Sequence, residues 1–234
     1  NRAYTAGAVG IDTIVYYDQF GNNTTEFVIG TAVAGWVLSN QTDKMYLSLG
    51  TDVGEYTLGS AIAPTLFAQA IAPEALILDE TNGYLFVLRT GSATLRRLDL
   101  TNLASVTTFP TTVTPNTAVG TFFPVTNEVI LQRSTDLIGV NALSGAITTR
   151  YSLGVGETVL RIEYIPDLGV IAYTSVIGGT YYLTVLDASF NLVGVYSSAL
   201  VTWLGFTYDS ESEMIVLPET TGTIRTLIFT LQSI

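Results

Sequence analysis

The chain has 234 residues, of which 48% are hydrophobic and 12% are charged, and its formal net charge is -11. This charge disfavours nucleic acid and anionic membranes as partners. The lack of cysteine and histidine excludes disulfides, structural zinc, thiol catalysis and histidine-based triads. No apolar run is long enough for a membrane-spanning helix, so we expect no membrane insertion. The chain begins with Asn1, and we interpret it as a processed chain or a fragment.

The first predicted elements are two short strands, at residues 12–19 and 25–31. Both are rich in β-branched and aromatic residues, which suit the pleated surface of a sheet. Compared with the segments that follow, they match the third and fourth strands of a four-stranded unit. The head of the chain is therefore expected to form half a repeat.

From residue 34 onward, a quartet of strands recurs about every 42 residues. The second strand that begins at residue 84 is typical: it reads Tyr-Leu-Phe-Val-Leu-Arg-Thr, and the turn-forming residues Thr-Asn-Gly precede it. Self-similarity at such a period indicates a repeat architecture. The predicted blades span residues 34–70, 74–111, 116–153, 159–198 and 202–234, and the last of them lacks a fourth strand.

The predicted fold class is all-β: a β-propeller of about five four-stranded blades that forms one domain over residues 1–234. The strands within residues 12–31 would complete the last blade and close the ring, which would hide both edges. One strand is then surplus, because residues 12–19 and 224–231 both match a third strand. An open β-solenoid and a two-sheet sandwich are the rival architectures, and a sandwich does not explain the repeat.

Four polar residues stand at equivalent positions after predicted third strands: Asp18, Asp99, Asn141 and Asp187. Asp and Asn side chains accept hydrogen bonds from the backbone a few residues ahead, so we interpret these residues as caps of the turn before the fourth strand. The alternative is a ring of carboxylates that binds cations, but such turns should lie far from a propeller axis. No metal site and no cofactor is expected, because no loop is dense enough in oxygen ligands for calcium.

One repeat carries a resemblance to known proteins. Its segments Leu76-Ile-Leu-Asp79, residues 83–91 and Leu95-Arg-Arg-Leu-Asp99 resemble blades of the YVTN/NHL/quinoprotein-like propellers. The resemblance covers most of the chain as a pattern and implies the propeller architecture without a particular function. The Trp-Asp signature of WD40 blades is missing, because neither Trp36 nor Trp203 is followed by Asp. In size alone, the chain is similar to small five-bladed lectins.

Four residues near the starts of predicted first strands are candidates for ligand binding: Trp36, Trp203, Glu74 and Glu157. In propellers, the loops at this end of the strands surround the central channel, where sites are usually found. An exposed Trp could stack on a sugar ring, or it could fill a gap between blades in the core. Two opposed carboxylates could act as the acid and base of a glycoside hydrolase. No catalytic signature is present, so no catalytic residue is assigned.

Together, these features predict a non-catalytic binding or structural module that contacts other protein chains, outside the cell, at a cell surface or on a virus particle. The neutral, Thr-rich composition and the single lysine, Lys44, motivate this prediction. The surplus strand would suit docking to another chain by strand addition. One alternative is a lectin-like propeller that binds glycans through pockets repeated in several blades. The other is a glycoside hydrolase with one deep pocket.

Overall fold

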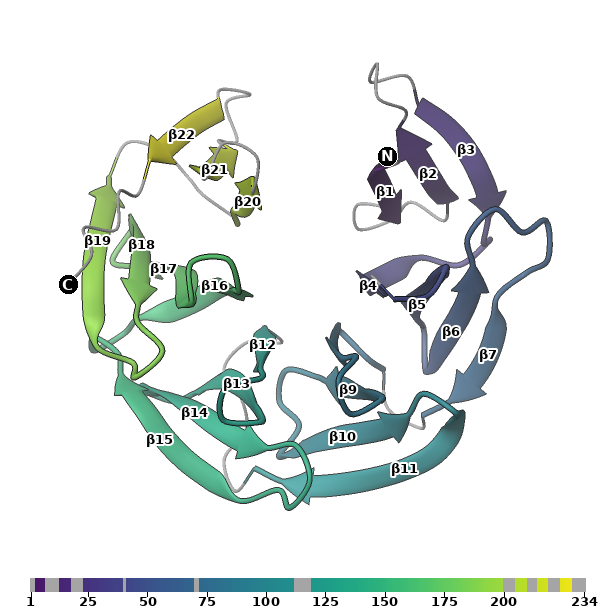
Figure 1. The fold of residues 1–234 in the computed structure, drawn as a ribbon, viewed down its shortest axis with the longest axis horizontal. Coiled ribbons are helices and arrows are strands. Elements are labelled where there is room, and N and C mark those ends of the chain that lie inside the picture. The colour runs from purple at the N-terminus through teal and green to yellow at the C-terminus, as the bar shows by residue number, and fades with distance from the viewer. Residues whose placement is uncertain are drawn as a thin grey trace. The chain divides into compact units, whose positions relative to one another are not determined.

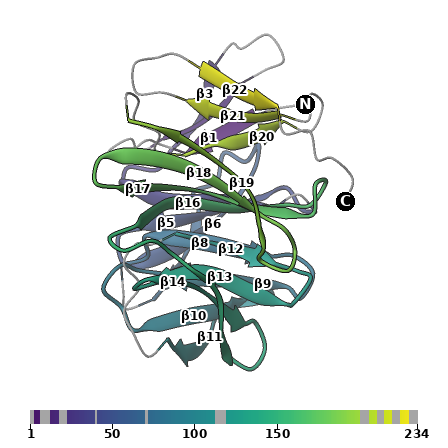
Figure 2. The same ribbon diagram turned by 90° about the vertical axis from the view of Figure 1, so that its left-hand side faces the viewer.

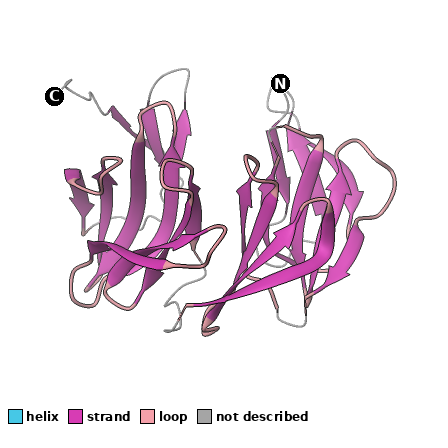
Figure 3. Ribbon diagram, turned by 60° about the horizontal axis from the view of Figure 1, so that its bottom comes forward, coloured by secondary structure: helices cyan, strands magenta, loops and turns pink. Residues whose placement is uncertain are grey.

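The computed structural model describes residues 3–6, 13–17, 23–39, 41–69, 72–111, 119–199, 205–209, 214–218 and 224–228. Every regular element in these ranges is a β-strand (Figure 3), so the all-β prediction is confirmed. The chain forms two compact units, Asn1–Thr112 and Val113–Ile234, and each contains three antiparallel sheets.

The first unit contains one three-stranded and two four-stranded sheets, in which the strands lie side by side in chain order (Figure 1). The three-stranded sheet consists of β1 (Ala3–Ala6), β2 (Thr13–Tyr17) and β3 (Asn23–Val28). The next sheet consists of β4 (Val33–Leu38), β5 (Lys44–Leu49), β6 (Asp52–Thr57) and β7 (Thr65–Ala68). The last consists of β8 (Ala75–Asp79), β9 (Tyr84–Leu88), β10 (Thr94–Asp99) and β11 (Asn102–Pro110).

The second unit repeats this construction, with its three-stranded sheet at the end of the chain. The first sheet consists of β12 (Gly120–Phe123), β13 (Glu128–Arg133), β14 (Asp136–Asn141) and β15 (Ile147–Ser152). The second consists of β16 (Thr158–Ile165), β17 (Val170–Ile177), β18 (Thr180–Leu186) and β19 (Leu192–Ser198). The third consists of β20 (Thr207–Asp209), β21 (Met214–Pro218) and β22 (Ile224–Ile228).

Four of the sheets have four strands, so the structure contains four complete blades and the predicted number of about five is wrong. The difference arises at the chain ends, where β1–β3 and β20–β22 each form a sheet of three strands. The sequence does not predict β1, because its four residues are too few to show a strand period. Ring closure by the terminal strands stays a prediction.

The second strand of a blade is apolar on both faces because neighbouring sheets pack on both sides of it. β17 illustrates this arrangement in the middle sheet of its unit (Figure 2). Ile171 and Tyr173 belong to the core shared with the preceding sheet, while Val170 and Ala172 belong to the core shared with the following one. Alternate residues of a strand point to opposite faces, so one continuous apolar run serves two cores.

The first strands of neighbouring blades approach each other closely. In the first unit, β4 contacts β8, and a side chain built on Gly35 would place its Cβ 2.6 Å from the carbonyl oxygen of Glu74. A contact that short excludes any residue larger than glycine unless the backbone shifts. In the second unit, the first strands β12 and β16 are in contact in the same way: the backbone amide of Tyr164 on β16 donates to the hydroxyl of Thr121 on β12, at 3.1 Å. These contacts hold the start of each blade against its neighbour.

Candidate functional site

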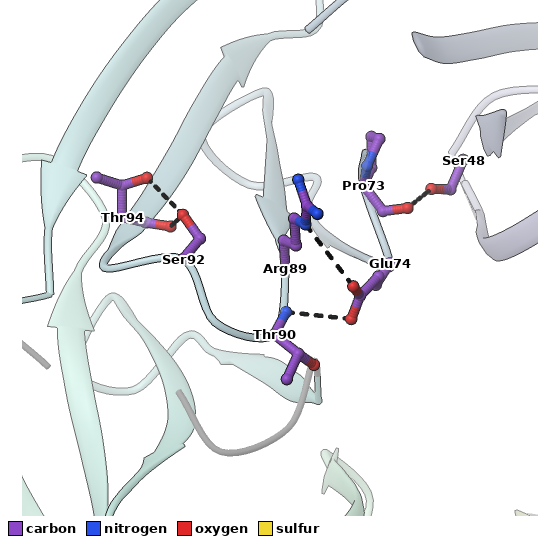
Figure 4. A network of polar contacts seen from close by, with 7 residues as sticks. All are labelled: Ser48, Pro73, Glu74, Arg89, Thr90, Ser92 and Thr94. Atoms are coloured by element: carbon purple, nitrogen blue, oxygen red, sulfur yellow. Dashed lines mark hydrogen bonds and ion pairs between the residues drawn. The ribbon is translucent and has the colours of Figure 1, made fainter. Parts of the chain in front are cut away.

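The turns before the first strands are tied to the preceding blade by a polar residue at a fixed position. Ser48, the fifth residue of β5, donates from its hydroxyl to the carbonyl of Pro73 (Figure 4). Gln132, the fifth residue of β13, donates to the carbonyl of Glu157 at 2.8 Å and accepts from the amide of Val159 at 2.8 Å. Both side chains are buried, so these bonds form without competition from water.

Glu74 and Glu157, the two acidic candidates, both stand directly before a first strand. The Glu74 carboxylate accepts from the amide of Thr90 at 3.1 Å, and its other oxygen lies 3.9 Å from Nε of Arg89 (Figure 4). The Glu157 carboxylate accepts from the amide of Gly154 at 2.7 Å and from the Ser175 hydroxyl at 2.6 Å. The Glu74 carboxylate thus binds groups of its own blade, whereas that of Glu157 binds Ser175 of its own blade and Gly154 of the loop before it.

Of the two tryptophans, the structure describes Trp36 and does not extend to Trp203. Trp36 lies on β4 opposite Leu47 of β5, and 38% of its surface is exposed. It is therefore not a fully buried filler between blades. An indole with this exposure keeps a face that a ligand ring could contact.

Three of the four predicted turn residues are described, and Asp18 lies outside the described ranges. An oxygen of Asp99 accepts from the amide and hydroxyl of Thr101, at 2.8 and 2.6 Å. Asn141 accepts from the amide of Ser144 at 2.9 Å. Asp187 accepts from the amides of Ser189 and Asn191, both at 2.8 Å.

The bonds to the ionised carboxylates lower two pKa values. For Asp99, the hydrogen bond from the Thr101 hydroxyl is the main cause of a pKa below the usual 3.8. For Asp187, the hydrogen bond from the Asn191 side chain is the main cause of the lowered pKa. Both carboxylates bind groups within the turns in which they lie.

Sequence reasoning missed a partly buried ion pair in the β12–β15 sheet, in which Glu128 is buried and Arg150 is partly exposed. The Glu128 carboxylate lies 2.6 Å from Nη2 of Arg150 and accepts from the Thr126 hydroxyl at 2.7 Å. The Arg150 guanidinium lies 5.5 Å from the ring centre of Phe190. Gly139 leaves the space for the carboxylate, since a Cβ there would lie 2.4 Å from its oxygen. A glycine inside an apolar strand was the available signal, because such a residue marks a close approach.

The outer edge of the β16–β19 sheet is apolar and uncharged. β19 is the last strand of this sheet (Figure 1). It contains no Asp, Glu, Lys or Arg, and Leu192, Val193 and Val195 are exposed on it. We call these three side chains with their strand the β19 edge. Edge strands usually carry charges or proline that prevent pairing with another chain, as Pro110 does at the end of β11. The β19 edge carries neither.

Within the described residues, no group of three acidic side chains is placed to hold a metal ion. The same ranges contain no helix that is long and apolar enough to cross a membrane.

No protein-family profile and no curated protein sequence matches this chain, whereas many solved structures do. A chain of a nidogen/laminin complex has a TM-score of 0.69 at 10% identity, over 96% of this chain and 92% of that chain. A streptogramin B lyase has a TM-score of 0.60 at 12% identity, over 94% and 77%. A virginiamycin B lyase from Staphylococcus aureus, with quinupristin, has a TM-score of 0.61 at 13% identity, over 95% and 79%.

The chain is a β-propeller. At these identities, the neighbours establish the fold and leave the activity open. The propeller architecture that the resemblance in the sequence implied is therefore confirmed.

Proposed function

We propose that this propeller is a non-catalytic binding module that acts through protein–protein contacts, with the β19 edge as its contact surface. The uncharged strand with exposed Leu192, Val193 and Val195 carries the proposal. An extended segment of a partner can add to such an edge through main-chain hydrogen bonds, while its side chains pack beside the exposed residues. The nidogen/laminin complex supports a protein-binding role at the level of the fold.

A location outside the cell, at a cell surface or on a virus particle, belongs to the same proposal. The chain has nine basic residues against twenty acidic ones, and Lys44 is its only lysine. Its surface therefore depends on neutral polar side chains, which suits stable contact with another protein better than binding to polyanions.

The enzymatic alternatives find less support. The Staphylococcus aureus lyase is catalytically inactive when a histidine is replaced by alanine, and this chain has no histidine. A glycoside hydrolase needs carboxylates that face the substrate, whereas Glu74 and Glu157 bind their own backbone and side-chain neighbours. Glycan binding depends on the exposed face of Trp36. A Trp36→Ala variant that loses retention on immobilised glycans would favour the lectin-like alternative.

The test compares Val195→Lys with Val106→Lys, a matched control on β11. Both side chains are exposed in the structure, so neither change should disturb the core. The immobilised chain is exposed to an extract of its source, and retained proteins are quantified. We expect Val195→Lys to retain at least about tenfold less partner than the wild type, because a lysine on an edge strand opposes pairing. Equal retention by all three proteins would overturn the assignment of the β19 edge.

A further inference from the structure

The first unit contains a cavity of about 330 Å³ beside its first complete blade. It lies between the β5–β6 turn, the loop before β7, and the segment around residues 29–31 that links β3 to β4. This volume falls at the lower end of the range for small-molecule sites, which is roughly 300–1,000 Å³. The cavity is open to solvent on one side, since Thr31 and Thr51 are exposed.

The walls of this cavity are mostly apolar. Ile29, Leu49, Pro64 and Leu66 contribute them. Gly54 lets two of these side chains approach its backbone, since a Cβ there would lie 2.8 Å from Leu49 and 3.3 Å from Pro64. Leu49 is buried, whereas Leu66 keeps 55% of its surface exposed. A ligand that covers the exposed part of Leu66 removes this apolar surface from water, which contributes to its affinity.

Among the residues that the structure describes, Asp52 is the only ionisable one that lines the cavity. Its carboxylate has one hydrogen-bond donor recorded in the structure, the Thr51 hydroxyl at 3.4 Å, which is a long contact. Asp136 occupies the same place at the start of β14, but it accepts from the Ser152 hydroxyl at 3.2 Å and lies outside the cavity. Asp136 is therefore a matched carboxylate that does not line this cavity.

We propose that this cavity binds a small organic cation, namely a protonated amine with an apolar body of about six carbons. The ammonium group pairs with Asp52, and the hydrocarbon part covers Leu49, Pro64 and Leu66. A metal ion does not fit, because calcium requires six or more oxygen ligands and this site offers one carboxylate and two threonine hydroxyls. The net charge of -11 further raises the local concentration of cations. The proposal is independent of the β19 edge.

The test measures binding of hexylammonium to the intact chain by titration calorimetry, with 1-hexanol as the neutral probe of equal length. We expect hexylammonium to bind about tenfold more tightly than 1-hexanol, and high salt to reduce this difference. Asp52→Asn should abolish the preference for the cation, while the matched variant Asp136→Asn should keep it. Equal binding of the two probes, or equal losses in both variants, would overturn the proposal, as would no binding at all.

A second variant tests the apolar wall. Leu66→Ser alters an exposed side chain and should fold normally, which circular dichroism would verify. We expect it to weaken both probes by a similar factor, because it removes apolar contact without changing charge. If Asp52→Asn fails to fold, the comparison of the two probes on the wild type and on Leu66→Ser still decides the outcome: a cation preference that survives in both supports the site. Unchanged binding of both probes by Leu66→Ser would contradict it.

Discussion

Asp187 shows how single polar residues stabilise this propeller. Its carboxylate accepts hydrogen bonds from the Asn191 side chain and from the amides of Asn191 and Ser189, and these bonds, that of the side chain first, lower its pKa below 3.8. A carboxyl group whose folded-state pKa is depressed contributes stability above the unfolded pKa. That contribution is lost as the pH falls below about 4 and through the folded-state pKa. The same reasoning applies to Asp99, whose main donor is the Thr101 hydroxyl.

Tyr46 gives the opposite pH dependence. Burial, with the negative charges of Glu55 and Glu80, raises the pKa of Tyr46 from 10.0 to about 12. As the pH rises from 10 to 12, the unfolded chain loses this proton before the folded chain does, so stability falls. We expect Tyr46→Phe to lose less unfolding free energy than the wild type between pH 9 and pH 11.5, by on the order of 2 kcal/mol. Urea unfolding at both pH values measures this, and parallel losses would contradict it.

Gly139 provides a prediction about the partly buried ion pair. Replacing it with alanine would force the Glu128 carboxylate away from Arg150, because the new Cβ would lie 2.4 Å from the carboxylate oxygen. We expect Gly139→Ala to destabilise the fold by about 1–2 kcal/mol, since the displaced Glu128 carboxylate loses its bonds to Arg150 and Thr126. Gly205→Ala is the control, because its Cβ would meet nothing closer than 3.9 Å. Urea unfolding should separate the two variants, and equal stability would refute the steric argument.

At the scale of elements, the contact between neighbouring blades combines an apolar core with a few buried polar bonds. In the second unit, Phe123 and Ile130 pack with Ile162 and Ile171 of the next sheet. Gln132 adds two directional hydrogen bonds to this apolar contact, one to the carbonyl of Glu157 and one from the amide of Val159. Apolar packing alone tolerates sliding, whereas a side chain with two partners fixes where the next first strand begins.

Gln132→Leu tests this role. The leucine removes both bonds and leaves the Glu157 carbonyl and the Val159 amide without this partner. We expect a loss of about 2–3 kcal/mol and much faster hydrogen exchange at the Val159 amide. Ser48→Ala, which removes a single bond to Pro73, should cost about 1 kcal/mol. Unchanged exchange at Val159 in the Gln132 variant would contradict the proposed role.

At the scale of the whole molecule, every sheet of four strands packs against a neighbour in its own unit. Tyr46 and Val53 share a core with Leu76 of the next sheet in the first unit, and Phe123 shares one with Ile162 in the second. Closure of the ring by the terminal strands remains a prediction at this scale, motivated by the need of radial architectures to hide their edges.

Deletion of residues 1–31 tests ring closure. β1 contacts β4, so the deletion should lower amide protection in β4 and β5 in any case. If the head also closes the ring, protection should fall in β20–β22 of the second unit as well. Hydrogen exchange read by mass spectrometry distinguishes the two outcomes. A loss confined to the first unit would rule out closure by the head.

Much of the blade construction is predictable from local pattern. A second strand such as β9 reads as a continuous apolar run bounded by turn formers, because both of its faces are buried. The acids before the first strands, Glu74 and Glu157, are found by their place in the repeat. Their hydrogen-bond partners cannot be found in this way, because Thr90 and Ser175 come later in the chain and are brought near by strand pairing.

The sequence by itself determined that this chain is an all-β repeat of propeller blades, because strand alternation, turn chemistry and repeat length are properties of neighbouring residues. Only the tertiary structure decided that the chain ends form separate three-stranded sheets and that the buried Glu128 pairs with Arg150. It also decided that Asp52 lines a cavity together with Leu49, Pro64 and Leu66. These features depend on which segments, distant in the sequence, contact each other in the fold. The same local sequence pattern is compatible with different tertiary contacts.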